Sequence, residues 1–580
     1  MPGITDLPVE LHIDNLLPIL PLPDLLSLGL TNKAFATLCR DETLWKRKLQ
    51  ADFNFSGAGT ARTSGWKFIY LRLTKPRVYV WGNQGNGRLG LSKLPKATLP
   101  GVPFPTELRI PGRRIVSLVA GGMSFHALDD EGQIYVWGTL DGTSFALNSD
   151  GYSEPAKPAP TPMRLALPHP TRSISCGRIH ACSLDAKQAV WNFLNWGRPF
   201  KMTSHHFSSR SIVQVECGWA FSAVLTKSGD VLVWWPFSGR LKERFDEKMA
   251  EMDRDGDKKV LPIEDNTIPC IPWEVEEHPT LLPPLPPLPD FSEEKSDKET
   301  RLIQIAGYED HLIGLTNKGH VLLFDSLGGD TSVQNGRWTY LPKFSELAKV
   351  RSHPTFANNK ATPPAKMKIT HVSAHFRHFI AYSTEGSSIV LMGNLETTSE
   401  MQPQIIPELQ NQSIISVVLG DYHYGALTST GKLLTWGAFS NGALGLGDPA
   451  DLPVGAPGGF ATEQHRLQAV ERRRGEPPAV EVPTEVRFDH HRKRPKERFC
   501  VAAAASGWHM GALVIDLESN ERDDDSDVEM EFKDREEPGR AIRRGIGIPP
   551  HDPSIPMIAR GAPVFRVGFA GRGAGRGGHM

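Results

Sequence analysis

Residues 419–437 read LGDYHYGALTSTGKLLTWG, and residues 217–235 read CGWAFSAVLTKSGDVLVWW. Both stretches carry a Gly, a bulky residue three positions later, an apolar pair, a Thr, a second Gly and an apolar run that contains Trp. Short apolar runs joined by a Gly-containing turn are typical of paired β-strands. Recurrence in the same register indicates a repeating fold rather than a catalytic motif.

The frame recurs in two halves, each found seven times. The first half, a small residue followed by a bulky one and an Ala-Leu-like pair, opens at Gly121, Gly177, Gly218, Gly307, Ala374, Gly420 and Ser506. The second half, an apolar strand ending in Trp-Gly or its remnant, is found at Val78–Gly82, Ile134–Gly138, Ala189–Phe193, Val231–Trp235, Val321–Asp325, Ile389–Gly393 and Leu433–Gly437.

The order of the halves predicts a closed ring. The first unit along the chain is a lone second half, VYVWG at 78–82, and the last is a lone first half, SGWHMGAL at 506–513. A ring in which the two chain ends share one blade requires such complementary fragments, and closure protects the sheet edges. We therefore predict a mainly β fold, a seven-bladed β-propeller over residues 77–517.

Two copies continue into a Gly-rich ending, GNQGNGRLG at 82–90 and SNGALG at 440–445. The full pattern resembles the repeat of the regulator of chromosome condensation family. That resemblance implies a seven-bladed propeller, and it also implies an alternative function, the regulation of a small GTPase or chromatin binding. The other five copies lack the ending, which counts against this alternative.

Two long insertions separate the repeats, at 240–300 and 447–498. Their acidic, basic and Pro-rich composition predicts loops on the rim or face of the propeller rather than further blades. The run LPPLPPLP at 282–289 suits a stiff spacer, which we favour, or a polyproline II ligand for an aromatic groove.

The first fifty residues have a helical pattern. Ile13, Leu16, Leu17 and Leu20 follow the spacing of one helix face, and Pro18 predicts a kink or two short helices. So short a segment cannot bury all of its leucines alone. Either it packs on the propeller or it offers an apolar face to a partner.

This segment resembles an F-box, through L-P-x-E-L at 7–11, L-P-D-L-L at 22–26 and L-W-K at 44–46. The combination is similar to fungal F-box proteins with condensation-regulator repeats, of the SCF-associated-factor type. The resemblance implies docking to a Skp-type adaptor and, through it, to a cullin-RING ubiquitin ligase. The residues expected to contact the adaptor are Leu7, Pro8, Leu11, Leu16, Leu20, Leu25, Leu28 and Trp45.

The predicted domains are an F-box at 1–50, a helical linker packed on the propeller at 51–76, the propeller at 77–517 and a disordered tail at 518–580. The linker is too apolar to be free in solution, with Trp66 and Phe68 among its residues. The tail is acidic and then rich in Gly and Arg, a composition typical of disorder.

Composition narrows the classes of function. The net charge of −1 gives no general attraction to nucleic acid or anionic membranes, so we expect no membrane partner, and binding to nucleic acid is not favoured. No apolar run has the length of a membrane span, and the N-terminus lacks a basic secretory region. We expect an intracellular protein, cytoplasmic, nuclear or both. The basic cluster at 490–496 suits an import signal, a nucleic-acid patch or a solvated loop, and these alternatives stay open.

No motif for catalysis, nucleotide binding or a metal is present, so we expect no catalytic residue, no cofactor and no metal. The six cysteines lack Cys-x-x-Cys spacing and are expected to be buried fillers. His180, His423 and His509 occupy one repeat position and are expected to form hydrogen bonds between strands within each blade.

The expected function is that of a non-catalytic receptor subunit of an SCF (Skp-cullin-F-box) E3 ubiquitin ligase. In this reading the F-box docks the adaptor, and the propeller binds an unidentified target protein for ubiquitination and proteasomal degradation. A third alternative is a scaffold whose F-box acts outside any ligase.

Overall fold

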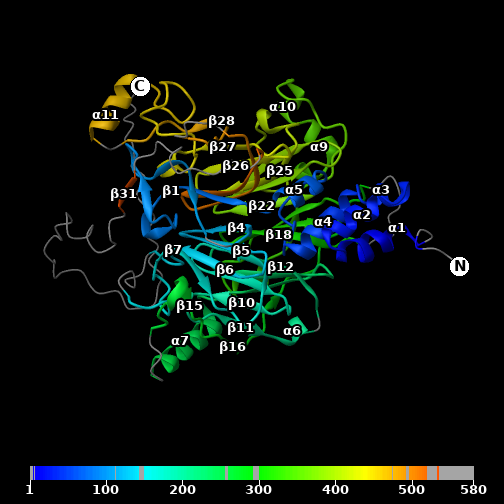
Figure 1. The fold of residues 1–580 in the computed structure, drawn as a ribbon, viewed down its shortest axis with the longest axis horizontal. Helices are drawn as coiled ribbons and strands as arrows, with labels where there is room; N and C mark the ends of the chain where they lie inside the picture. Colours follow the sequence, from blue (N-terminus) through cyan, green and yellow to red (C-terminus); the bar gives the residue numbers. More distant parts are fainter. Residues whose placement is uncertain are drawn as a thin grey trace. The chain divides into compact units, whose positions relative to one another are not determined.

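In the computed structural model of the chain, seven sheets of mainly antiparallel strands are arranged so that their inner strands form a closed ring (Figure 1). The inner strands are β4 (Ile115–Gly121), β8 (Thr171–Cys176), β12 (Ile212–Cys217), β18 (Leu302–Tyr308), β22 (His371–His375), β25 (Ile414–Leu419) and β29 (Arg498–Ser506). Each lies beside the next, and β29 lies beside β4. The predicted fold class, a mainly β seven-bladed propeller, is confirmed.

The two halves of the sequence frame form the second and third strands of each blade. The second strands are β5 (Ser124–Asp129), β9 (Ala181–Asp185), β13 (Ser222–Thr226), β19 (His311–Thr316), β23 (His378–Ser383), β26 (His423–Thr428) and β30 (His509–Asp516). The third strands are β1 (Arg77–Gly82), β6 (Ile134–Gly138), β10 (Val190–Phe193), β14 (Val231–Trp234), β20 (Val321–Phe324), β24 (Ile389–Asn394) and β27 (Leu433–Gly437).

Outer strands complete six of the blades over the described part of the chain, and the blade of β22 has three strands. The outer strands are β3 (Val102–Leu108), β7 (Ala159–Leu165), β11 (Phe200–Thr203), β17 (Thr280–Leu281), β21 (Trp338–Tyr340) and β28 (Val480–Glu485). Strand β2 (Lys93–Pro95) pairs separately with β31 (Phe532–Asp534).

The structure describes residues 4, 7–110, 113–142, 149–208, 210–254, 259–291, 299–472, 475–490, 496–518 and 532–534. The chain divides into two units, Met1–Arg535 and Glu536–Met580, and the second lies wholly outside the described residues. The predicted disordered tail therefore falls almost entirely outside them, as does most of the basic cluster at 490–496.

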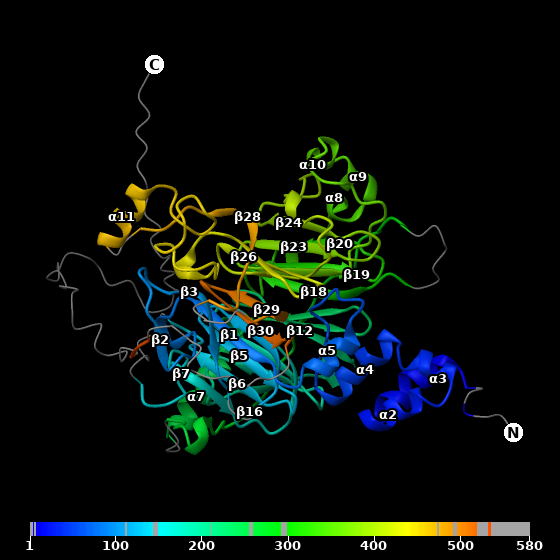
Figure 2. The same cartoon turned by 45° about the horizontal axis from the view of Figure 1, so that its top comes forward.

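The two chain ends share one blade, as predicted. Strand β1 pairs with β30 in antiparallel register, from Val78 opposite Leu513 to Gly82 opposite His509. Figure 2 shows these strands side by side. Val78 and Leu513 are both buried in one apolar cluster, so the ring is closed by packing as well as by the hydrogen-bond ladder.

Gly82 allows β1 and β30 to approach each other closely at this seam, the pairing that joins the two chain ends in one blade. Its φ is +105°, and a Cβ there would lie 2.6 Å from the Trp508 carbonyl oxygen. We expect Gly82→Ala to lower the free energy of unfolding by roughly 1–3 kcal/mol, because neither φ nor space suits a side chain. Gly59→Ala is the control, since a Cβ at Gly59 meets nothing within 4 Å. Denaturant midpoints measure both variants, and equal midpoints would contradict a close seam.

The insertions contain more regular structure than predicted. In 240–300, α7 (Gly239–Arg254) is a helix, and β15 (Thr267–Ile268) and β16 (Trp273–Glu276) add parallel strands to the outside of β7 and β11. They extend two blades rather than form new ones. The 447–498 segment contains the helix α11 (Glu463–Arg472) and also strand β28, so the prediction of a simple loop is wrong there.

The Pro-rich run at 282–289 packs along the propeller through its leucine side chains. Leu282, Leu285 and Leu288 contact the cluster shared by the β12 and β18 blades, whereas Pro284 and Pro287 are exposed. This three-residue period is that of polyproline II. The Trp338 indole N–H also donates to the Pro283 carbonyl at 3.1 Å. The packing favours the spacer interpretation.

Most of residues 9–52 and all of residues 66–72 are helical, and these helices form one apolar cluster with the propeller. Their elements are α1 (Val9–Leu11), the π-helical turn η2 (His12–Leu16), the 3₁₀ turn η3 (Leu17–Ile19), α2 (Leu22–Gly29), α3 (Lys33–Leu38), α4 (Glu42–Asp52) and α5 (Trp66–Arg72). The break predicted at Pro18 is present as the change from η2 to η3.

The remaining helical elements are single turns on the loops. They are α6 (His205–Ser208), α8 (Pro342–Ser345), α9 (Leu347–Arg351), α10 (Pro354–Ala357), η4 (Gly85–Gly87), η6 (Glu264–Asn266), η7 (Ser332–Asn335), η8 (Pro407–Leu409) and η9 (Ser440–Gly442). Among the described residues, no helix combines the length and apolarity that crossing a membrane requires.

Candidate functional site

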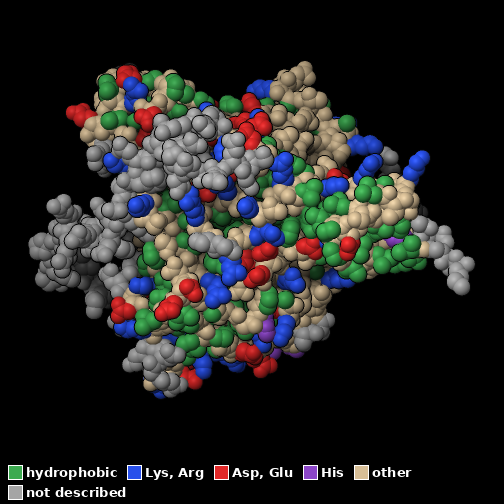
Figure 3. All heavy atoms as spheres, in the orientation of Figure 1, with side chains coloured by type: hydrophobic (Ala, Val, Ile, Leu, Met, Phe, Trp, Pro, Cys, Tyr) green, Lys and Arg blue, Asp and Glu red, His purple; other side chains and the backbone are tan. Residues whose placement is uncertain are grey.

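An apolar surface covers the outer side of the N-terminal helices. We call it the N-terminal apolar surface, and its exposed members are Leu7, Val9, Leu11, Ile19, Leu26 and Leu30. Ile19 is 76 % exposed and Leu30 88 %. Figure 3 shows hydrophobic side chains gathered over α1–α3. Contiguous exposed apolar side chains mark an interaction site.

The residues predicted to contact an adaptor fall into three groups. Leu7, Pro8 and Leu11 are exposed, and Leu16, Leu20 and Leu28 are half-buried. Leu25 and Trp45 are completely buried. The prediction is corrected for these two side chains, because a group inside the helical core cannot touch a partner directly.

Trp45 holds the helices together instead. Its indole N–H donates to the Cys39 carbonyl at 2.9 Å, and its ring lies 5.2 Å from that of Tyr70 on α5. The Tyr70 hydroxyl donates to Asp52 at 2.6 Å, and burial followed by this bond raises the pKa of Tyr70. Trp45 therefore links α4 to α5.

The exposed set also contains residues that the sequence-based contact set omits: Val9, Ile19, Leu26 and Leu30. Leu26 and Leu30 lie four positions apart, the spacing of one helix face. This spacing could have indicated that Leu26 and Leu30 share a face. Helix periodicity alone does not tell whether such a face packs in the core or contacts a partner.

The N-terminal segment is fixed to one end of the propeller. Helix α5 shares its apolar cluster with Phe499 and Ile515 of the seam blade. Further along, the Asn54 amide donates to the Thr171 carbonyl at 2.9 Å, and the Ala61 N–H donates to the Ile415 carbonyl at 2.7 Å. The segment therefore crosses the ends at which the inner strands begin.

Six inner strands carry a bulge at this end. The bulged residues are Val116, Arg172, Val213, Ile303, Ile415 and Val501. The N-terminal segment contacts the first two and the last two through its apolar cluster and its hydrogen bonds. Val213 and Ile303 stay 51 % and 45 % exposed. Most of this end is therefore occupied by the chain itself.

The opposite end carries an aromatic surface. We call it the turn face, formed by Arg178, Trp219, Phe376, Tyr422 and Trp508 in the turns that follow the inner strands. The ring of Phe376 lies 5.7 Å from that of Trp219 and 5.6 Å from that of Tyr422. Tyr422 and Trp508 are 50 % and 37 % exposed. Trp, Tyr and Arg are the residues that dominate binding energy at protein interfaces.

Asp421 organises the turn face. Both of its carboxylate oxygens accept from the Arg178 guanidinium at 3.0 Å, and Oδ1 lies 3.3 Å from His375 Nε2. Arg178 also lies over the Trp219 ring, 5.0 Å from its centroid. Because Arg178 follows β8 and Asp421 follows β25, the ion pair joins blades that are not neighbours in the ring.

The pKa of Asp421 is lowered to about 2. Burial alone would raise it, but the hydrogen bond with His375 and the charge of Arg178 outweigh burial. Since the folded pKa lies below the ordinary value of 3.8, the carboxylate stabilises the fold above about pH 4, and this contribution is lost as the pH falls toward about 2.

We expect Asp421→Asn to cost about 2 kcal/mol of stability near neutral pH and to flatten the acid side of the stability profile. Denaturant unfolding at several pH values measures both effects. Asp489→Asn is the control, because Asp489 pairs with the exposed Arg487 at 3.0 Å within one loop. If the free energy of unfolding fell in parallel for Asp421→Asn and for the parent chain as the pH is lowered, the acid-side stability could not be assigned to Asp421.

The backbone of the turn face is strained at Phe376, whose φ is +53°. A bulky residue in the left-handed region costs on the order of 1–3 kcal/mol. The corresponding turn of the seam blade has a glycine in this region, Gly507, with φ +48°. Keeping an aromatic ring where glycine fits better is consistent with a role for the turn face in binding.

Two of the repeat histidines, His180 and His509, bond between blades rather than within them, and neither ring nitrogen of the buried His423 has a hydrogen-bond partner among the described residues, which corrects the prediction. His180 Nε2 lies 2.9 Å from the Ser222 hydroxyl of the next blade, and His509 Nε2 lies 3.2 Å from the Ser124 carbonyl oxygen of the next. Burial lowers the pKa of His509 well below its ordinary value, so this ring is neutral. These two histidines are therefore contacts between neighbouring blades.

No protein-family profile matches the chain. It is 32 % identical over 122 residues to SCF-associated factor 1 of Saccharomyces cerevisiae, covering 20 % of this chain and 16 % of that protein. It is 29 % identical over 189 residues to the human E3 ubiquitin-protein ligase HERC2, covering 30 % of this chain and 4 % of HERC2. It is 23 % identical over 395 residues to Protein pim1 of Schizosaccharomyces pombe, covering 64 % of this chain and 57 % of pim1.

Among solved structures, yeast RCC1 (Prp20) bound to Kap60 covers 77 % of this chain and 90 % of its own, at 17 % identity and a TM-score of 0.47. Human WBSCR16 covers 77 % of this chain at 18 % identity and a TM-score of 0.46, with all of its own chain matched. The chain covers less than two thirds of the length of each of the curated relatives named above. The chain is a repeat β-propeller with N-terminal helices, and it is similar in sequence to parts of these relatives.

Proposed function

We propose that the protein is the non-catalytic substrate-recognition subunit of an SCF-type ubiquitin ligase. The observation that carries this proposal is the N-terminal apolar surface, which stays exposed although the helices beneath it have a complete core. The match to SCF-associated factor 1 supports it. An intracellular location, cytoplasmic or nuclear, is part of the proposal.

The F-box helices dock a Skp-type adaptor, and through it a cullin-RING ligase. Leu7, Pro8 and Leu11 contribute side chains from the start of the domain, and Leu16, Leu20 and Leu28 contribute their accessible edges. Ile19, Leu26 and Leu30 extend this surface. Helix α5 and the anchored segment after α4 hold it rigidly against the propeller.

The turn face binds the target protein. The N-terminal segment occupies most of the opposite end of the inner strands, and in the part of the chain that the structure describes the turn face keeps Tyr422 and Trp508 exposed. Its aromatic side chains and the Arg178–Asp421 pair provide a preorganised surface. Ubiquitin transfer is then accelerated by proximity to the charged enzyme rather than by residues of this chain.

Co-purification tests the two surfaces separately. Leu7→Ala with Pro8→Ala is expected to lose the Skp-type adaptor while keeping targets, and Tyr422→Ala with Trp508→Ala is expected to lose targets while keeping the adaptor. Proximity labelling under proteasome inhibition reads out the targets. Unchanged adaptor binding in the first double variant would overturn the proposal. Val482→Ala, at a side chain 53 % exposed on the edge strand β28, is the control for both.

The alternative is a regulator of a small GTPase or a chromatin-binding propeller. The resemblance of the repeats, with the Gly-rich endings at 82–90 and 440–445, to those of the regulator of chromosome condensation family favours this second function. Stimulated nucleotide release on a panel of GTPases, retained in the Leu7→Ala, Pro8→Ala variant, would support it over the ligase.

A further inference from the structure

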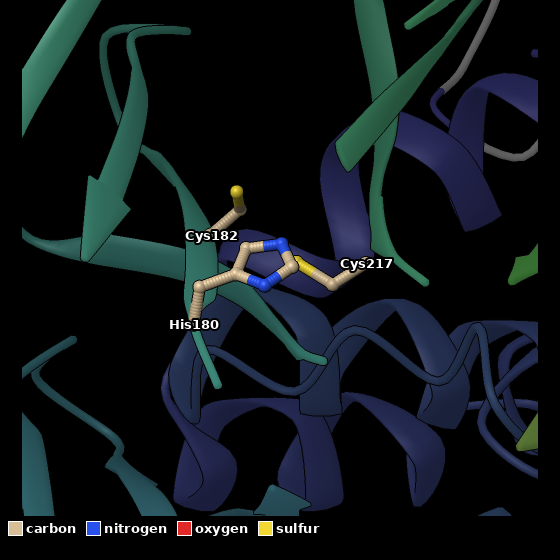
Figure 4. Close-up of side chains that lie close together, drawn as sticks. All are labelled: His180, Cys182 and Cys217. Carbon is tan, nitrogen blue, oxygen red and sulfur yellow. The ribbon is translucent and has the colours of Figure 1, made fainter. Parts of the chain in front are cut away.

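Three side chains of types that ligate metals meet at the interface between the β8 and β12 blades. His180 immediately precedes β9, Cys182 is the second residue of β9, and Cys217 ends β12. Their ligand atoms all lie within 4.8 Å of one another, and all three side chains are buried. Figure 4 shows both cysteine side chains beside the His180 ring.

The Ser222 hydroxyl supplies a fourth corner. It lies 2.9 Å from His180 Nε2, 3.2 Å from Cys182 Sγ and 4.0 Å from Cys217 Sγ. Zinc bonds of about 2.0 Å to nitrogen and about 2.3 Å to sulfur place tetrahedral ligands roughly 3.3–3.8 Å apart. The three Ser222 distances lie near this range, and the other three are no longer than 4.8 Å, so the four atoms are close enough together to surround one ion.

We propose that the chain binds one Zn²⁺ at this seam through His180, Cys182 and Cys217, with the Ser222 hydroxyl in the fourth position. Binding exchanges two thiol protons for one divalent ion, and both protons leave to solvent. A zinc ion, two thiolates, a neutral imidazole and a hydroxyl carry no net charge. A neutral complex suits a buried seam, whereas an uncompensated ion there would be costly.

Ligand chemistry selects zinc among common ions. Sulfur and imidazole ligands suit Zn²⁺, while Ca²⁺ and Mg²⁺ require oxygen-rich sites. The surrounding hydrogen bonds also permit the exchange. The Cys182 thiol now donates to Asn192 Oδ1 at 3.2 Å, and when that proton leaves, the same oxygen keeps its bond from the Trp234 indole at 2.9 Å.

The ion would fix two residues of the turn face. Arg178 lies two positions before His180, and Trp219 lies two positions after Cys217. A metal bridge between these turns would hold the guanidinium and the indole in their stacked arrangement. The metal site itself does not depend on the proposed ligase function.

The test is metal content and ligand identity in the full-length protein. After equilibration with zinc and dialysis, we expect about one zinc per chain, and X-ray absorption with about two sulfurs near 2.3 Å and two lighter ligands near 2.0 Å. Cys182→Ser and Cys217→Ser should each lower the zinc content at least tenfold. Cys500→Ser, at an equally buried thiol in the seam blade, should keep it.

Two results with the parent chain would overturn the site: less than about a tenth of a zinc per chain, or a metal shell without sulfur. Full zinc retention in both cysteine variants would do the same. The absorption measurement uses the parent chain alone, so the outcome does not depend on whether a variant folds.

Discussion

Replacing Trp45 with alanine should lower the stability of the N-terminal helices by about 3–5 kcal/mol, the usual cost of removing a large buried aromatic side chain. The Trp45 side chain is completely buried, its indole N–H bonds the Cys39 carbonyl, and the Lys67 ammonium lies 5.1 Å from its ring. Hydrogen exchange over residues 9–73 measures the loss, with the blades as an internal reference.

Two controls separate packing from contact with a partner. Ile19→Ala removes a side chain that is 76 % exposed and should leave exchange unchanged. Trp45→Phe keeps most of the buried volume and should restore much of the protection and any adaptor binding. Unaltered exchange in Trp45→Ala would show that Trp45 does not hold the helices together.

The second large effect concerns the N-terminal apolar surface. We expect Leu26→Asp with Leu30→Asp to weaken adaptor binding by at least about 30-fold, the scale of losing interface residues worth about 2 kcal/mol. Leu30 is 88 % exposed and Leu26 43 %, so the fold should keep its stability. Titration calorimetry with the purified Skp-type adaptor measures the dissociation constant.

A matched substitution tests whether position or charge matters. Leu467→Asp with Val470→Asp places the same two charges on α11 at side chains that are 60 % and 38 % exposed, and this variant should not change adaptor affinity. Equal weakening by both changes would mean a general electrostatic effect, and full affinity in the Leu26, Leu30 variant would exclude α2 from the interface.

Sequence reasoning predicted the ring because the second and third strands carry a fixed motif, and the fragments at 78 and 506 are complementary. It did not find the inner strands, since β29 reads RFCVAAAAS and lacks an alternating pattern. The outer strand β28 was assigned to a loop because the segment around it, 447–498, is rich in Gly, Pro and charged residues. Periodicity finds strands whose own sequence alternates. Strands β29 and β28 are instead formed by pairing with the strands beside them, β30 and β27.

The candidate sites show the same division. The leucine pattern at the N-terminus indicated an apolar module, but the pattern is the same for Leu25, which is buried, and Leu26, which is exposed. The turn face depends on Arg178 meeting Asp421 across 243 positions, and the seam cluster on His180 meeting Cys217. No spacing rule contains such pairs, because the ring brings them together only after it closes.

The shared blade has a consequence for biosynthesis. The N-terminal helices leave the ribosome first, yet Phe499 and Ile515, which seat α5, are among the last residues of the propeller to be made. A chain interrupted before β30 would leave β1 with a bare edge and α5 without its support. The N-terminal helices therefore gain their full support only when the last blade is complete, through residue 516.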